Sequence, residues 1–228
     1  METRETFLKA CNEICGNIGS FEAFRKGQVL RRQSSDSDLY REISFQSSSL
    51  NSASSIVIIP HIAVFSKKLK KYLLKEFPGI GSSGVIYANH IGYISPLQSF
   101  KEWHLAGASY SISVEQISKL IKTHVFPVFD IFDSTERAVD FLKSNGTSFN
   151  QWTIKSLMPL DFMLYSGQKS DAEAFFANYI NSSKRRNKLC QFYLSLKECD
   201  AIDPNYSEFE EAGYIKRAFM KNINLSLP

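Results

Sequence analysis

The sequence predicts an α+β fold: an antiparallel sheet of four to five strands flanked by helices, followed by an all-helical C-terminal subdomain. The first observation is the stretch Leu39–Phe65, which is typical of two strands joined by a polar connection. The second is that the strand candidates follow one another without the long crossover helices that a parallel sheet requires. The third is a wholly helical pattern after Gly146. We therefore predict a sheet domain over residues 1–146 and a helical subdomain over residues 147–228.

Residues 39–46 alternate strictly between two faces, the pattern of a strand that buries one side. One face is mainly apolar and the other is polar throughout. The first face consists of Leu39, Arg41, Ile43 and Phe45, and the second of Tyr40, Glu42, Ser44 and Gln46.

The run Ile56–Phe65 is apolar on both faces and rich in β-branched residues, which favours an inner strand of the sheet. It is too short for a membrane span, which needs about 20 apolar residues. Pro60 within the run favours an edge strand or a bulge, because proline cannot donate a ladder hydrogen bond. The small polar segment Ser47–Ser55 predicts a long hairpin loop between the two strands.

The remaining elements follow from periodicity and from capping residues. Pro127 is expected to kink or break the helix that precedes it. Further strands are expected over residues 28–32, 85–94 and 101–105, and helices over residues 3–18, 66–76, 113–124, 133–146, 149–165, 170–180, 184–198 and 207–222.

Composition limits the function classes. The chain has 228 residues and a net charge of +4, which permits an acidic partner without demanding nucleic acid. The first residues are charged and lack the apolar core of a secretory signal, so we expect a cytoplasmic protein with reduced cysteines and no membrane segment.

Four short motifs resemble an uncharacterised bacterial family, a domain of unknown function, over about residues 5–145. They are Phe24-Arg-Lys-Gly27, Leu30-Arg-Arg32, Ile43-Ser-Phe-Gln-Ser-Ser48 and Phe126-Pro-Val-Phe129. The family pattern reads Gly-Phe-Lys-Lys-x-Gly and Ile-Asn-Phe-Gln-Lys-Ser, and this chain departs from it at Ala23 and Ser47. The resemblance supports the fold, implies no established chemistry, and suggests a role in bacterial conflict systems such as toxin immunity.

Two groups of residues are candidate sites. Arg31, Tyr40, Arg41 and Gln46 are expected either to line a concave sheet face that holds an anion or peptide, or to form a cross-strand structural network. His61, His90 and His104 lie in or beside neighbouring strands and could share a face. Imidazoles are good metal ligands and acid–base groups. However, no HxH or HExxH pattern supports them, so neither a metal nor another cofactor is predicted.

No nucleophile elbow and no paired catalytic motif occurs in the sequence, so no catalytic residue is predicted. We expect a non-catalytic intracellular protein-binding protein, an immunity or accessory protein of a bacterial toxin or defence system, with a toxin as the expected partner. Arg31, Tyr40, Arg41, Gln46, His61 and His90 are its candidate binding residues. The alternatives are a metal-dependent or hydrolytic enzyme using the strand histidines, and a nucleic-acid binder using the basic segments Lys67–Lys75 and Lys184–Lys188.

Overall fold

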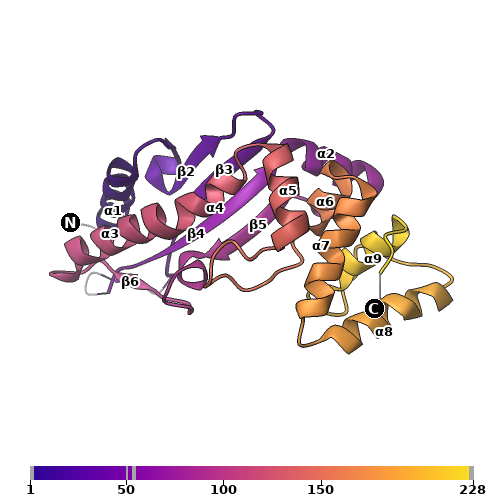
Figure 1. The fold of residues 1–228 in the computed structure, drawn as a ribbon. Coiled ribbons are helices and arrows are strands. Elements are labelled where there is room, and N and C mark those ends of the chain that lie inside the picture. The colour runs from indigo at the N-terminus through magenta and orange to yellow at the C-terminus, as the bar shows by residue number, and fades with distance from the viewer. Residues whose placement is uncertain (1–2, 50, 53–54, 226–228) are drawn as a thin grey trace. The chain divides into compact units, whose positions relative to one another are not determined.

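The computed structural model describes residues 3–49, 51–52 and 55–225 (Figure 1). The chain forms two compact units that interleave along the sequence. The first comprises Met1–Val64, Ala88–Asp133 and Asn150–Thr153, and the second comprises Phe65–Tyr87, Ser134–Phe149 and Ile154–Pro228. The predicted division into residues 1–146 and 147–228 has a single boundary, whereas these two units each combine several segments of the chain. Whether residues 1–146 and 147–228 fold as separate domains stays a prediction.

The predicted α+β class with an antiparallel sheet is confirmed. Within the described residues the strand order is β1-β2-β3-β4-β5, and β6 pairs with β4. The sheet has one strand more than predicted. The additional strand is β1, which was not predicted because its three residues are too few to show an alternating pattern. The strands are β1 (Glu22–Phe24), β2 (Val29–Gln33), β3 (Leu39–Ser47), β4 (Val57–Ser66), β5 (Val85–His90) and β6 (Trp103–His104).

Strands β3 and β4 form as the sequence predicts. Burial alternates along β3, with Leu39, Arg41, Ile43 and Phe45 all buried. Strand β4 lies between β3 and β5 as an inner strand, and Pro60 is buried within it. Of the predicted connection Ser47–Ser55, residues 50, 53 and 54 lie outside the described part of the chain, and Ser52 and Ser55 form an isolated bridge.

Helices of the first unit pack beside the β2–β3 part of the sheet (Figure 1). Helix α1 (Thr3–Ile18) contacts α3 (Ser109–Leu120), and Asn17 Nδ2 donates to Ser118 Oγ at 3.2 Å. Helix α3 begins four residues before the predicted start at residue 113, and the Ser113 hydroxyl donates to the His104 carbonyl at 2.6 Å.

Pro127 was expected to kink or break the helix before it, and the helix is interrupted there by a π-helical turn. A π-helical segment, Ile121–Val125, separates α3 from α4 (Phe126–Ile131), and Pro127 lies in the first turn of α4. Proline is tolerated there because the first-turn amides of a helix need no intrahelical partner.

The second unit is mainly helical. Its helices are α2 (Lys67–Glu76), α5 (Thr135–Asn145), α6 (Leu160–Ser166), α7 (Lys169–Ser182), α8 (Arg186–Ser195) and α9 (Ala212–Met220). Helix α6 contacts α2, α5, α7 and α9, which makes it the central element of the unit. The prediction of one helix over residues 149–165 is wrong, because the chain is irregular up to Pro159 and α6 begins directly after it. Helix α9 is likewise shorter than predicted.

None of the helices in the described residues is both long and apolar enough to cross a bilayer. The longest of them, α1, has 16 residues. A span needs about 20 predominantly apolar residues.

One buried ion pair anchors the helical unit. The Asp161 carboxylate of α6 accepts from Arg217 Nε and Nη2 of α9, both at 2.8 Å. Both side chains are only 7% exposed. Arg217 Nη1 also donates to the Pro204 carbonyl at 3.2 Å, so this guanidinium joins α9, α6 and the preceding loop.

The substitution Asp161→Asn should lower the free energy of unfolding by about 3–4 kcal/mol, because it leaves the buried Arg217 charge without a counter-ion. Urea unfolding followed by circular dichroism measures this. The matched control is Glu76→Gln, which breaks the partly exposed Lys221–Glu76 pair and should cost much less, because exposed ion pairs contribute little to stability. Equal losses for the two variants would contradict the anchoring role of Asp161.

Candidate functional site

The sheet register divides the predicted polar residues between two faces. Arg31 of β2 pairs with Glu42 of β3, and Arg32 pairs with Arg41. Directly paired residues share a face, and neighbouring residues point to opposite faces. Arg31, Tyr40 and Gln46 therefore lie on one face and Arg41 on the other, so the structure does not bring the four together.

On the first face, Arg31 lies between two aromatic rings. Its guanidinium is 4.6 Å from the Tyr40 ring centroid and 5.1 Å from that of Phe24. Its Nη2 and Nε donate to Glu42 Oε2 at 2.9 and 3.3 Å. The side chain of Arg31 is 41% exposed and Phe24 is 39% exposed. We call Phe24, Arg31 and Tyr40 the arginine stack; it holds a cation and two rings in fixed positions at the surface.

The charge of Arg31 affects the pKa of Tyr40. Burial raises the pKa of Tyr40, while the positive charge of Arg31 opposes that rise. The phenol therefore stays protonated at neutral pH.

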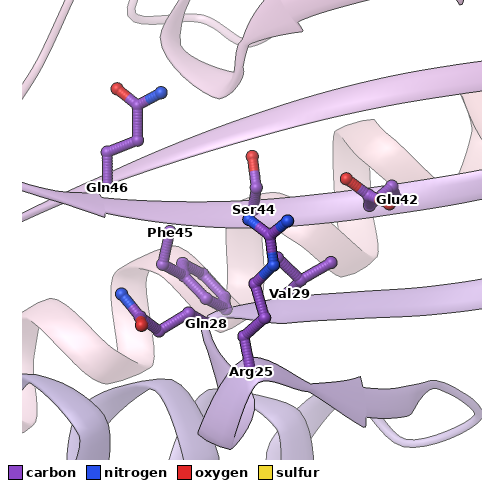
Figure 2. A pocket seen from close by; sticks show the side chains of 7 residues that line it. All are labelled: Arg25, Gln28, Val29, Glu42, Ser44, Phe45 and Gln46. Atoms are coloured by element: carbon purple, nitrogen blue, oxygen red, sulfur yellow. The ribbon is translucent and has the colours of Figure 1, made fainter. Parts of the chain in front are cut away.

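A pocket of about 290 Å³ lies beside the stack and is shown in Figure 2. We call it the Arg25 pocket. Its apolar lining is buried, whereas most of its polar groups come from β3 and from the turn before β2. The lining residues are Arg25, Gln28, Val29, Glu42, Ser44, Phe45 and Gln46.

The turn that positions Arg25 is strained. Strand β1 ends at Phe24, and Arg25, Lys26 and Gly27 follow with φ of 50°, 59° and 85°. A left-handed backbone costs a non-glycine residue about 1 kcal/mol or more. A side chain at Gly27 would place Cβ 2.5 Å from Asn12 Oδ1 of α1, so the turn fits tightly against that helix. This turn directs the Arg25 side chain toward β3, as Figure 2 shows.

A second pocket, of about 430 Å³, lies where the short β1 no longer covers the edge of β2. We call it the Glu22 pocket. It is lined by Ser20, Phe21, Glu22, Arg31, Arg32 and Gln33. Arg31 lines this pocket and its partner Glu42 lines the Arg25 pocket, so the arginine stack lies between the two.

On the opposite face, Arg41 is a structural residue that is only 2% exposed. Its Nη1 donates to the Phe129 carbonyl at 3.2 Å and to Asp133 Oδ1 at 3.1 Å, and its Nη2 donates to the Gln33 carbonyl at 2.8 Å. Burial, and then the charge of Arg32, lower the pKa of Arg41, although a guanidinium stays charged. Arg41 thus fastens α4 to the sheet and is inaccessible to a ligand.

The structure brings together two of the three strand histidines. The rings of His61 and His90 meet edge to face with centroids 5.4 Å apart. His90 is 4% exposed and is surrounded by the rings of Tyr93, Phe100 and Trp103. His104 lies on the exposed side of β6. Of the three histidines that could share a face, only His61 and His90 come together.

The hydrogen bonding of His90 argues against a metal-binding role. The Gly92 amide donates to His90 Nδ1 at 3.0 Å, which also ends β5 and begins a 3₁₀ turn, Ile91–Ile94. With Nδ1 as the acceptor, a neutral ring carries its proton on Nε2 and presents a donor there, whereas a metal needs a lone pair. No group of three or more histidine, cysteine, aspartate or glutamate side chains in the described residues could hold a metal ion.

The same pair is poorly suited to acid–base catalysis. Burial, and then the neighbouring His61, lower the pKa of His90 to about 4, and burial lowers the pKa of His61 as well. Within the described part of the chain, neither ring contacts a carboxylate or a nucleophile through a hydrogen bond, and both Nε2 atoms are buried without a partner of normal geometry. The pair is an aromatic-lined core feature.

Sequence reasoning missed Phe24, Arg25, Glu42 and Ser44 as site residues. The alternation of β3 already placed Glu42 and Ser44 on the polar face. Phe24 and Arg25 could have been found only from β1 and its left-handed turn, for which Gly27 is the one local signal.

The buried role of Arg41 predicts a large effect on stability. Arg41→Met should lower the free energy of unfolding by about 2–4 kcal/mol, because it removes the buried guanidinium and its hydrogen bonds to the Phe129 carbonyl, the Gln33 carbonyl and Asp133. Urea unfolding measures this. Arg31→Met removes the same charge from the exposed face and should cost under about 1 kcal/mol. A loss at Arg41 no larger than that at Arg31 would contradict the assignment.

The lowered pKa of His90 predicts loss of stability in acid. Between the ordinary pKa of 6.5 and the folded value of about 4, the unfolded chain binds a proton that the folded chain does not. Stability should therefore fall as pH drops through this window, by up to about 3 kcal/mol. His90→Asn keeps an acceptor for the Gly92 amide but does not titrate, so it should lose less stability over that range.

Urea unfolding between pH 7 and pH 4 compares the wild-type chain with His90→Asn. Trp103→Phe alters the same cluster without removing the titrating ring, so it should destabilise by a similar amount at each pH. Parallel pH profiles for the wild type and His90→Asn would exclude His90 as the source.

Comparison of the chain with known proteins identified no relative. No protein-family model, no curated protein and no solved structure matches the chain.

Proposed function

We propose that this chain is a non-catalytic protein-binding protein, which contacts its partner through the face of β1–β3 that carries the arginine stack. The observation that supports the proposal most strongly is the Arg31 guanidinium held between the half-exposed Phe24 ring and Tyr40, with a pocket on each side.

The chemistry of this face favours a protein over a small molecule. Arginine and tyrosine are enriched among the residues that dominate binding energy at protein interfaces. Arg31 is already oriented by Glu42 and two rings, so little side-chain entropy is lost on binding. Small-molecule sites are mostly apolar and deeply enclosed, whereas the two pockets here are lined mainly by polar side chains.

The nature of the partner is a second part of the proposal. The motifs that resemble the bacterial family include Phe24, Arg25 and the β3 segment, and these also build the proposed face. We infer that the partner is a toxin or another component of a bacterial defence system, and that the chain acts in the cytoplasm as an immunity or accessory protein.

The two alternatives have weaker support. The hydrogen bond to His90 Nδ1 and the lowered pKa of both rings disfavour an enzyme that uses His61 and His90. In the basic run near α8, Arg185 is paired with Glu211 and lies with Lys188 over the Phe209 ring. That ring is therefore engaged by cations of its own chain, which disfavours base stacking.

Arg31→Ala should weaken binding of the partner by about tenfold or more, because it removes the central cation of the stack. The measurement is isothermal titration calorimetry against the purified proteins encoded beside this gene, which are the first candidates for a partner. Lys119→Ala, on the exposed side of α3, should bind like the wild type.

Binding that is unchanged by Arg31→Ala would overturn the proposed face. Binding of nucleic acid with a steep dependence on salt, in place of protein, would overturn the function itself.

A further inference from the structure

We propose that the Arg25 pocket binds the carboxylate of an aspartate or glutamate side chain on the partner protein. This inference rests on the proposed function, because it names the chemistry that the partner brings to the same face. Four observations support it: an uncompensated cation, a set of donors, a buried apolar lining and a favourable charge balance.

The first observation is the charge of Arg25. Its guanidinium has no hydrogen-bond or ion-pair partner in the described residues, whereas Arg31, Arg32 and Arg41 are paired with Glu42, Asp130 and Asp133. Exposed arginines are common, but this one is held toward a pocket by a turn with φ of 50° at Arg25 itself. Arginine is well suited to bind a carboxylate because its planar fork can donate two parallel hydrogen bonds.

The second observation is a set of neutral donors in the lining of the same pocket. The hydroxyl of Ser44 and the amide of Gln46 have no hydrogen-bond partner among the residues that the structure describes, and both line the pocket. The Gln28 side-chain oxygen accepts from Arg4 Nη2 at 3.4 Å, which leaves its NH₂ group available. A carboxylate has about four lone-pair positions, and these groups supply donors for those that Arg25 leaves unfilled.

The third observation is the buried apolar part of the lining. Val29 is 9% exposed and Phe45 is 3% exposed. Val29 pairs with Ser44 and shares its face, so it offers contact to the methylene groups of an acidic side chain. The Phe45 side chain points to the opposite, core face of β3. A volume of about 290 Å³ lies at the lower limit of ligand pockets and suits a single side chain better than a nucleotide or a cofactor.

The fourth observation concerns Glu42, a carboxylate that also lines the pocket. Both hydrogen bonds from Arg31 reach Glu42 Oε2, so that negative charge is already balanced. With Arg25 counted, Arg25, Arg31 and Glu42 together carry one net positive charge. This balance matches a singly charged carboxylate better than a phosphate group, which carries nearly two charges at neutral pH.

The test uses the ¹⁵N-labelled full chain and a minimal probe, N-acetyl-glutamate N-methylamide. Titration should shift the backbone amides of Ser44 and Gln46 and saturate in the millimolar range. The glutamine counterpart of the probe, which has the same shape without the charge, should bind about tenfold more weakly or not measurably, because the charged pair adds about 1.4 kcal/mol.

The variant Arg25→Gln should weaken binding of the glutamate probe to the same extent. Lys26→Gln is the matched control, since it removes the same charge from the next left-handed residue, which does not line the pocket. It should bind within about twofold of the wild type, because a neighbouring exposed charge contributes little. Ser44→Ala gives a second reading, a smaller loss, if Arg25→Gln perturbs the turn.

Equal binding of the two probes, or equal losses for Arg25→Gln and Lys26→Gln, would overturn the pocket assignment. Inorganic phosphate that binds more tightly than the glutamate probe, in an Arg25-dependent way, would overturn the carboxylate as its ligand. The two proposals fail separately. If the glutamate probe does not bind but Arg31→Ala still weakens partner binding, only this inference fails. If the probe binds but Arg31→Ala leaves partner binding unchanged, only the proposed partner face fails.

Discussion

The period of two along β3 is the constraint on which the first unit depends. Because neighbouring residues of a strand face opposite ways, this one segment supplies both a wall of the core and a surface. Arg41 points to the covered side and holds α4 through the Phe129 carbonyl. Glu42, the next residue, points to the other side and fixes Arg31 in the arginine stack. A slip of one residue in the β2–β3 register would exchange these roles.

That alternation is also what made the sheet predictable. The burial of Leu39, Ile43 and Phe45 and the inner position of β4 followed from local pattern alone, as did the limits of α1. What local pattern could not supply was the partner of Arg41, whose acceptor at Phe129 lies 88 residues away. A lone arginine on an apolar face therefore looked like a ligand-binding residue, although it satisfies backbone carbonyls. The irregular chain before Pro159 was missed because apolar spacing there resembles a helix.

The candidate site was predictable only in part, and for a related reason. Arg31, Tyr40 and Gln46 were found because they belong to strands with clear patterns. Arg25 was not, because its position depends on a left-handed turn that ends a three-residue strand and closes against Asn12 of α1. The sequence left open whether His61 and His90 meet, and their chemistry is set by one hydrogen bond from the Gly92 amide. Such a bond fixes a tautomer and leaves no trace in residue spacing.

The strained turn at residues 25–27 bears on binding, because its backbone conformation has an energetic cost. Two successive non-glycine residues in the left-handed region cost about 2 kcal/mol or more together, and glycine or asparagine would reverse the chain there more cheaply. The turn gains no compensating bond from the Arg25 side chain in the described residues. What the turn provides is a direction, because it points the Arg25 side chain toward Ser44 of β3 and the buried Val29. A backbone that already directs an uncompensated charge toward its site leaves only the side-chain rotamers to be ordered when an opposite charge arrives, and this is the property expected of a recognition site.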